Sequence, residues 1–140
     1  MTGKEVIAKV KALNLPGGSY VVFGGGPLAA VGLREVNDID MYVTPDVWKR
    51  MKLEGWKELD KGGKDVPLVH DCFEMHTNWD FSSYNPTLAH LLETAIVVDG
   101  VAFAALEEVR KWKLAYNRSK DHTDIVLIDK YLQRSQDGVV

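Results

Sequence analysis

Residues 20–43 read YVVFGGGPLAAVGLREVNDIDMYV and contain the strongest signals in the chain. The apolar run at 20–23 predicts a buried strand, and the glycines after it lead into a short helix over about 27–31. A second strand is predicted at 39–43, with Asp38 and Asp40 at its head. Because side chains alternate across a strand, both carboxylates are expected on one face of the sheet.

This pair of aspartates predicts a cation site. Two carboxylates held so close repel each other unless a cation lies between them. Mg²⁺, or Mn²⁺ in its place, prefers such oxygen ligands. The turn at Gly24 and Gly25, which opens a helix, can bring backbone N–H groups against a phosphate. Together these features predict a metal–nucleotide site.

Length and composition are those of an ordinary globular protein. The 140 residues fit a single domain over 1–140, and the net charge of −3 disfavours a broad nucleic-acid-binding surface. The one cysteine, Cys72, cannot form an internal disulfide, which suits a reducing cytosol. The first residues lack the apolar stretch of a signal peptide, and no apolar run could span a bilayer. We therefore expect a cytoplasmic protein without a membrane partner.

The rest of the chain alternates between helical and strand patterns. Apolar spacing and turn residues predict a small mixed sheet flanked by helices, of class α/β or α+β, with a C-terminal helical pair. The predicted helices cover about 3–13, 44–53, 105–117 and 120–132, with a short one after 85–87, and the predicted strands cover 55–59, 72–77, 96–98 and 101–103.

The order of strand, glycine pair, helix, arginine and Asp-x-Asp resembles the nucleotidyltransferase fold of the DNA polymerase β superfamily. The likeness is closest to its small bacterial members, the minimal, antibiotic-modifying and AbiEii-type toxin nucleotidyltransferases. Gly24 and Gly25 match the glycine pair of that family, and Asp38 and Asp40 match its carboxylates. Arg34 lies where many relatives carry an arginine.

The C-terminal part extends the resemblance to roughly residues 20–132. Relatives often follow a hairpin like that at 98–103 with a helix that carries Leu-Glu and later Lys-Leu, and then with a Lys-Asp-x-x-Asp pattern. In this chain the matching positions lie within the helical part at 105–132 and are Leu106-Glu107, Lys113-Leu114 and Lys120-Asp121-His122-Thr123-Asp124.

The resemblance implies an enzyme that moves a nucleoside monophosphate from an NTP to a hydroxyl acceptor, with Mg²⁺ or Mn²⁺ as cofactor. The acceptor is left open among a small molecule, a tRNA end and a protein. Two alternatives stand beside it. One is a toxin–antitoxin component that acts by binding a partner protein. The other is a degenerate family member that keeps a nucleotide pocket without transfer. Whether the partner is another protein or a second copy, as in a homodimer, is left open.

A third carboxylate usually completes the metal site of this family. Glu74 alternates with its apolar neighbours in the predicted strand 72–77 and is the best candidate, as metal ligand or as base toward the acceptor. Relatives more often carry aspartate there. Asp71 and Asp80 are the rival candidates.

Lys113 falls inside the apolar stripe of the predicted helix 105–117. A lysine there normally has an anionic partner or a phosphate to meet, unless its ammonium reaches solvent, and we expect a phosphate contact. Arg34 is expected either to bind the triphosphate or to fix its loop. Asp121 is assigned to the nucleotide site by the family pattern.

Asp121 also has a structural interpretation. Asp121 or Asp124 could pair with Lys113 or Lys120 and hold the last two helices together, or Asp121 could cap its helix. The histidines show no spacing typical of a metal site, so His70 and His76 are not predicted as transition-metal ligands. The four tryptophans are expected to pack in the core or at its rim.

Overall fold

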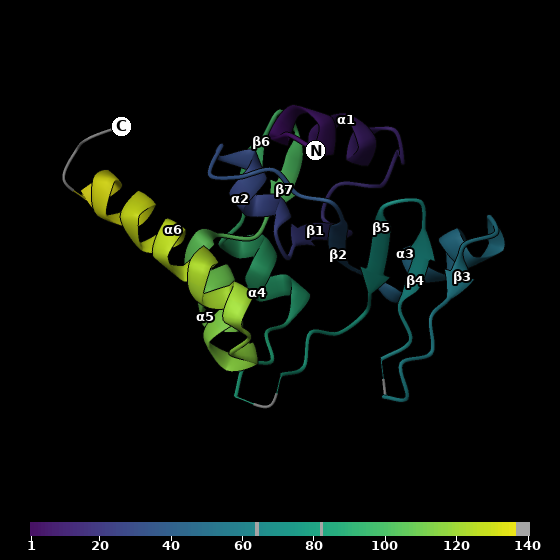
Figure 1. Cartoon of the computed structure of the whole chain (residues 1–140). Helices are drawn as coiled ribbons and strands as arrows, with labels where there is room; N and C mark the ends of the chain where they lie inside the picture. The colour runs from purple at the N-terminus through teal and green to yellow at the C-terminus, as the bar shows by residue number, and fades with distance from the viewer. Residues whose placement is uncertain (64, 82, 137–140) are drawn as a thin grey trace.

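The computed structural model describes residues 1–63, 65–81 and 83–136. Its described part forms one seven-stranded mixed sheet with helices on both faces (Figure 1). This confirms the predicted mixed α/β class. Residues 64, 82 and 137–140 of the expected domain lie outside the described residues.

The sheet has the strand order β3-β4-β5-β2-β1-β7-β6. Strand β1 pairs antiparallel with β2 and parallel with β7, and the middle strand β2 also pairs parallel with β5. Antiparallel pairs complete the two ends of the sheet. The strands are β1 (Tyr20–Phe23), β2 (Ile39–Val43), β3 (Lys57–Glu58), β4 (Leu68–His70), β5 (Phe73–His76), β6 (Ile96–Val98) and β7 (Val101–Phe103).

Some of the helices begin at a threonine whose side chain caps them. Thr2 forms a capping box with Glu5 at the first helix, and Thr44 caps a helix that opens with Pro45. The helices are α1 (Gly3–Lys11), α2 (Gly26–Ala30), α3 (Pro45–Leu53), α4 (Leu88–Glu93), α5 (Leu106–Tyr116) and α6 (Ser119–Gln136).

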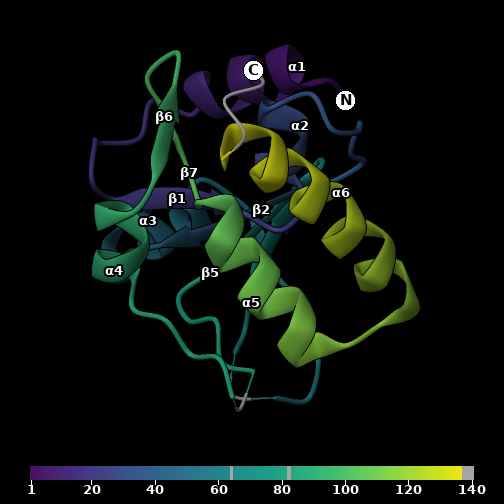
Figure 2. The same cartoon turned by 90° about the vertical axis from the view of Figure 1, so that its left-hand side faces the viewer.

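Alternation along the strands divides the core into two layers. One face of β2 and β5 carries only apolar side chains, which pack with α1 and α3. The opposite face of the sheet packs against α4, α5 and α6 through a cluster rich in aromatic residues. In the side view, α5 and α6 cross in front of the middle of the sheet (Figure 2). On β2 and β5, one face is therefore wholly apolar and the other can carry polar groups.

Most elements match the predictions, with three differences. The predicted strand 55–59 is only two residues long, and α6 continues beyond 132 to Gln136. Strand β4 was missed, because Pro67 beside it argues against a strand and its turn into β5, Asp71-Cys72, is not a usual hairpin sequence. Asp71 takes the left-handed conformation, with φ +53°, that closes this turn.

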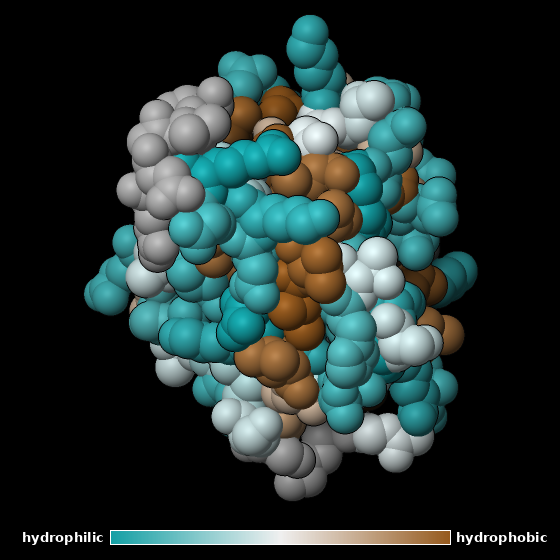
Figure 3. Space-filling model, turned by 60° about the vertical axis from the view of Figure 1, so that its left-hand side comes forward, coloured by the Kyte–Doolittle hydropathy of each residue, from teal (hydrophilic) through white to brown (hydrophobic). Residues whose placement is uncertain are grey.

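The outer surface is mostly polar. On the side turned forward in Figure 3, apolar residues form a stripe with hydrophilic residues on both sides. Within the described residues, no helix has both the length and the apolar character needed to cross a membrane.

Candidate functional site

A cleft of about 620 Å³ opens on the face of the sheet that carries α5 and α6. Its floor includes Asp40, Glu74 and His76 from the strands, and its wall includes Trp112 and Arg118 from the C-terminal helices and their connection. Asp38, Gly25 and Arg34 line it as well. The structure thus brings most of the predicted site residues to one cleft.

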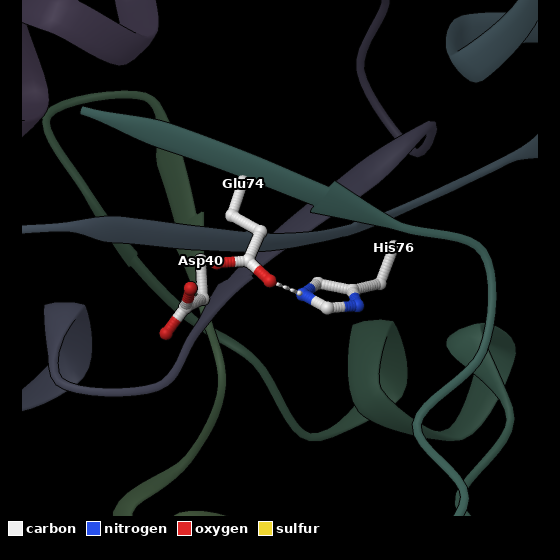
Figure 4. Close-up of side chains that lie close together, drawn as sticks. All are labelled: Asp40, Glu74 and His76. Atoms are coloured by element: carbon white, nitrogen blue, oxygen red, sulfur yellow. Dashed lines mark ion pairs between the residues drawn. The ribbon is translucent and has the colours of Figure 1, made fainter. Parts of the chain in front are cut away.

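Strand register places the two floor carboxylates side by side. Asp40 of β2 is the partner of Glu74 in the parallel pair with β5, and Tyr42 is the partner of His76. Because residues two apart in a strand share a face, Glu74 and His76 leave β5 on the same side as Asp40 (Figure 4). This is the face predicted from the alternation around Asp40.

Gly24 makes room for Asp40. Its φ of +63° is a conformation that side chains rarely adopt, and a Cβ built there would lie 2.3 Å from Asp40 Oδ2. The first glycine of the pair therefore lets the aspartate carboxylate pack against the backbone after β1. A Cβ on Gly25 would meet the side chains of Val36 and Arg34. Both glycines allow close packing at this turn, whether or not the turn binds a ligand.

Glu74 is surrounded by cations. It lies 3.3 Å from His76 Nε2, and it accepts a hydrogen bond from Lys61. The hydrogen bond with His76 and the contact with Lys61 outweigh partial burial and lower the pKa of Glu74 to about 2. Glu74 is therefore ionised at neutral pH.

His76 bridges two carboxylates. Its Nδ1 lies 2.5 Å from Asp65 Oδ2, and its Nε2 faces Glu74. Burial disfavours the charged ring, but the hydrogen bonds to Asp65 and Glu74 outweigh burial and raise the pKa of His76 to about 9. Asp65 also accepts from the Asn78 amide at 3.4 Å, which fixes the carboxylate behind the ring.

Asp40 is the least compensated group of the floor. Its carboxylate makes no side-chain hydrogen bond or ion pair with another residue in the described part of the chain. Burial and the nearby charge of Glu74 raise the pKa of Asp40 to about 6, and Asp38 acts in the same direction. A dication would remove this repulsion.

Asp40, Glu74 and His76 form the cluster that could hold a metal ion. Each offers a ligand atom, and these atoms all lie within 4.8 Å of one another. This set differs from the predicted Asp38, Asp40 and Glu74, since His76 takes the third place. Asp38 is exposed and lies just before β2, where it lines the cleft without joining the cluster. Its role as a ligand stays a prediction.

A second group of charges forms the wall. Lys113 is only 2% exposed, and its ammonium lies 3.2 Å from an Asp121 carboxylate oxygen and 2.8 Å from one of Asp124. Asp124 also receives two hydrogen bonds from the Arg34 guanidinium, at 2.7 and 2.8 Å. The prediction that an aspartate of α6 pairs with Lys113 and ties the last two helices together is confirmed. Arg34 fixes its loop to α6, and it still lines the cleft.

Asp121 lies beneath the wall. It is fully buried and accepts hydrogen bonds from the Arg118 backbone and guanidinium. The Arg118 guanidinium in turn lies 3.8 Å from the centre of the Tyr116 ring. Asp121 thus positions cleft cations, and its assignment to the nucleotide site stays a prediction.

Aromatic side chains fill the space between floor and wall. Trp79 packs at 4.6 Å from Phe23 and 5.4 Å from Trp112, measured between ring centres, and it touches His76 edge-on. The indole N–H groups of both tryptophans are buried without a partner among the described residues. Core packing of the tryptophans is confirmed, and Trp79 and Trp112 also line the cleft.

The rival carboxylate Asp71 lies away from the cluster. It lies in the turn after β4 and pairs with Lys9 at 3.3 Å on the surface. His70 stacks on Trp56, on the face opposite to Glu74. Asp80 follows Trp79 and, like Asp71, is not part of the cluster found among the described residues.

Sequence reasoning missed His76, Asp65, Lys61 and Arg118 as parts of the site. The signal for His76 was present, because it stands two residues after Glu74 in the same predicted strand. Asp65 and Lys61 come from the connection between β3 and β4, whose path no local pattern fixes.

Comparisons with known proteins add no identification. No family model, no curated protein and no solved structure matches the chain. The proposed function therefore rests on the residues of the cleft.

Proposed function

We propose that this protein is a metal-dependent nucleotidyltransferase. The observation that supports this most is the in-register pair Asp40 and Glu74 on the floor of a cleft whose opposite wall carries cations. A divalent cation complexed with a polyphosphate has the complementary pattern of charge. The nucleotidyltransferase fold to which the sequence bears a resemblance is part of the same proposal.

The floor would bind the cation. Asp40 and Glu74 offer the oxygen ligands that Mg²⁺ and Mn²⁺ prefer. The two carboxylates lie close enough to repel each other, and a dication would compensate that repulsion. Asp38, at the mouth, would add a further carboxylate through a bound water or directly. When bound, the dication neutralises charge on phosphate oxygens and lowers the pKa of an attacking hydroxyl.

The wall would bind the phosphates. Lys113, Arg118 and Arg34 are held in place by Asp121 and Asp124, so their positions are fixed before any ligand arrives. Lys120 is exposed at the same cleft. Preorganised cations of this kind stabilise the charge that develops on a transferring phosphoryl group.

The reaction is a substitution at the α-phosphorus of an NTP. An acceptor hydroxyl oxygen forms the new P–O bond, the bond to the β-phosphate breaks, and pyrophosphate leaves with the electron pair. The hydroxyl proton passes to a carboxylate of the floor or to solvent. Most of the acceleration comes from positioning and charge stabilisation.

One observation favours this proposal over the degenerate alternative. A family member without transfer activity is expected to have Glu74 turned away from the aspartates, whereas Glu74 here lies beside Asp40 (Figure 4). The partner-binding alternative stays a prediction, which a pull-down with a stoichiometric partner would support.

The test is nucleotide binding and transfer. Purified protein is titrated with each NTP in the presence of Mg²⁺ or Mn²⁺, and α-labelled NTP is incubated with tRNA, with an aminoglycoside and with the protein alone. We expect Asp40→Asn to weaken nucleotide binding by at least about 10-fold. The matched control Asp71→Asn changes a surface carboxylate of the neighbouring turn and should bind as the unchanged protein does. Absence of binding, or equal binding by both variants, would refute the proposal.

A further inference from the structure

We infer that the cation site of this cleft is a mixed nitrogen–oxygen site that prefers transition-metal dications such as Mn²⁺ and Co²⁺ over Mg²⁺, with His76 as a ligand and Asp65 as its positioning residue. This inference rests on the cation site of the proposed function and goes beyond it, because it names the ligand that sets metal preference.

The first observation is the position of the ring. His76 leaves β5 on the same face as Glu74, and the cluster formed with Asp40 has all its ligand atoms within 4.8 Å of one another. The close-up shows the ring and the Glu74 carboxylate pointing toward each other (Figure 4). A cation bound by the two carboxylates would therefore lie within reach of the imidazole after small side-chain movements.

The second observation is independent of the cluster. Asp65 Oδ2 lies 2.5 Å from His76 Nδ1, and a carboxylate can only accept, so Nδ1 carries the proton. Nε2 is the nitrogen that faces Glu74, which also can only accept, and a dication that binds Nε2 would take the place of the proton there. A carboxylate behind the far nitrogen of a histidine is the arrangement that fixes metal-binding imidazoles in proteins.

Metal preference follows from the donor set. Mg²⁺ is a hard cation that takes oxygen ligands and gains little from imidazole. Affinities of nitrogen-containing sites rise from Mn²⁺ toward Co²⁺ and beyond. Lys61 also contacts Glu74, so an incoming dication must compete with its ammonium, and the added nitrogen ligand makes that competition easier for a transition metal.

The experiment measures two affinities for each protein without nucleotide. Free Mn²⁺ is followed by its electron paramagnetic resonance signal, and Mg²⁺ is measured by its displacement of bound Mn²⁺. We expect the unchanged protein to bind Mn²⁺ more than about 10-fold more tightly than Mg²⁺. His76→Gln should weaken Mn²⁺ binding by about 10-fold or more and leave Mg²⁺ binding within about 3-fold.

Two further variants sharpen the result. Asp65→Asn should lower the ratio of Mn²⁺ to Mg²⁺ affinity in the same direction as His76→Gln, which a merely structural role would not do. His70→Gln is the matched control, because His70 lies on the opposite face of the sheet against Trp56, and it should leave the ratio unchanged. Thermal melting of each variant verifies that it is folded.

The failures of the two proposals are distinguishable. Suppose that both metals bind and that Asp40→Asn abolishes their binding. If His76→Gln then leaves the ratio of Mn²⁺ to Mg²⁺ affinity unchanged, the ligands are oxygens alone. That result overturns this inference, while the proposed cation site stands. If neither metal binds the unchanged protein, both proposals fail. Binding of Co²⁺ that produces the absorption bands of nitrogen ligation, and loses them in His76→Gln, would support the inference directly.

Discussion

The two faces of β2 and β5 differ sharply although they belong to the same two strands. One face presents Met41 and Met75, both fully buried under the layer that contains α1 and α3. The other presents Asp40 and Glu74 to the cleft, where like charges lie together. The first arrangement supplies stability through apolar burial, and the second costs stability and supplies binding chemistry. Because side chains alternate along these strands, neighbouring residues serve stability on one face and binding on the other.

The largest effect is expected on the apolar face. Met41→Ala removes a fully buried side chain and should lower the free energy of unfolding by about 3 kcal/mol, through lost burial and the cavity left behind. Urea denaturation measures this. Mn²⁺ affinity at low temperature, where the variant is folded, should stay within about 3-fold. A large loss of metal affinity in folded Met41→Ala would show that the faces are not independent.

Gly24→Ala should affect both tasks at once. The added Cβ meets the Asp40 carboxylate, and the positive φ strains any side chain, so we expect a loss of about 2 kcal/mol together with about 10-fold weaker Mn²⁺ binding. Gly32→Ala is the matched control: its φ is +77°, but a Cβ there meets nothing within 4 Å. It should cost about 1 kcal/mol and leave Mn²⁺ binding unchanged. Equal metal affinities in the two variants would contradict the packing role of Gly24.

The smallest effect concerns the wall at acid pH. Burial alone would raise the pKa of Asp124, but hydrogen bonds from Arg34 and Lys113 outweigh it and lower the pKa below the ordinary 3.8. The unfolded chain therefore takes up this proton at a higher pH than the folded chain does. The stability contributed by Asp124 is present above about pH 3.8 and is lost as the pH falls through the lower, folded pKa.

Urea midpoints measured from pH 6 down to pH 3 test this linkage. Asp124→Asn should be less stable than the unchanged protein at pH 6, and the difference should shrink toward pH 3. Two parallel curves would show that the ion pairs of Asp124 contribute nothing to the acid sensitivity of the wall.

Local patterns in the sequence were sufficient for most of the fold. The helix start at Thr44-Pro45, the buried strand before the glycines and the alternation around Asp40 each depend on neighbouring residues, and each prediction was confirmed. The ion pair between Lys113 and the aspartates of α6 could be predicted because a lysine in an apolar stripe needs a partner.

The remaining features depend on contacts between distant segments. Arg34 and Asp124 are hydrogen-bonded although they lie 90 residues apart in the sequence. Asp65 contacts His76 from the irregular connection between β3 and β4. No periodicity or spacing encodes such contacts, because they depend on how loops and helices far apart in the sequence pack together. His76 is the exception, since alternation from Glu74 already placed it on the cleft face.

The parallel pairing of β2 with β5 has a consequence for synthesis. A ribosome-bound chain that has emerged through β5 already contains both carboxylates of the cleft floor, because Asp40 and Glu74 precede residue 77. The strand that pairs with the far side of β1 and the helices that carry Lys113 and Arg118 are still to be made. The nascent chain therefore passes through a stage in which the floor carboxylates are uncovered and have Lys61 and His76 beside them, and only the last third of translation supplies the helices of the wall.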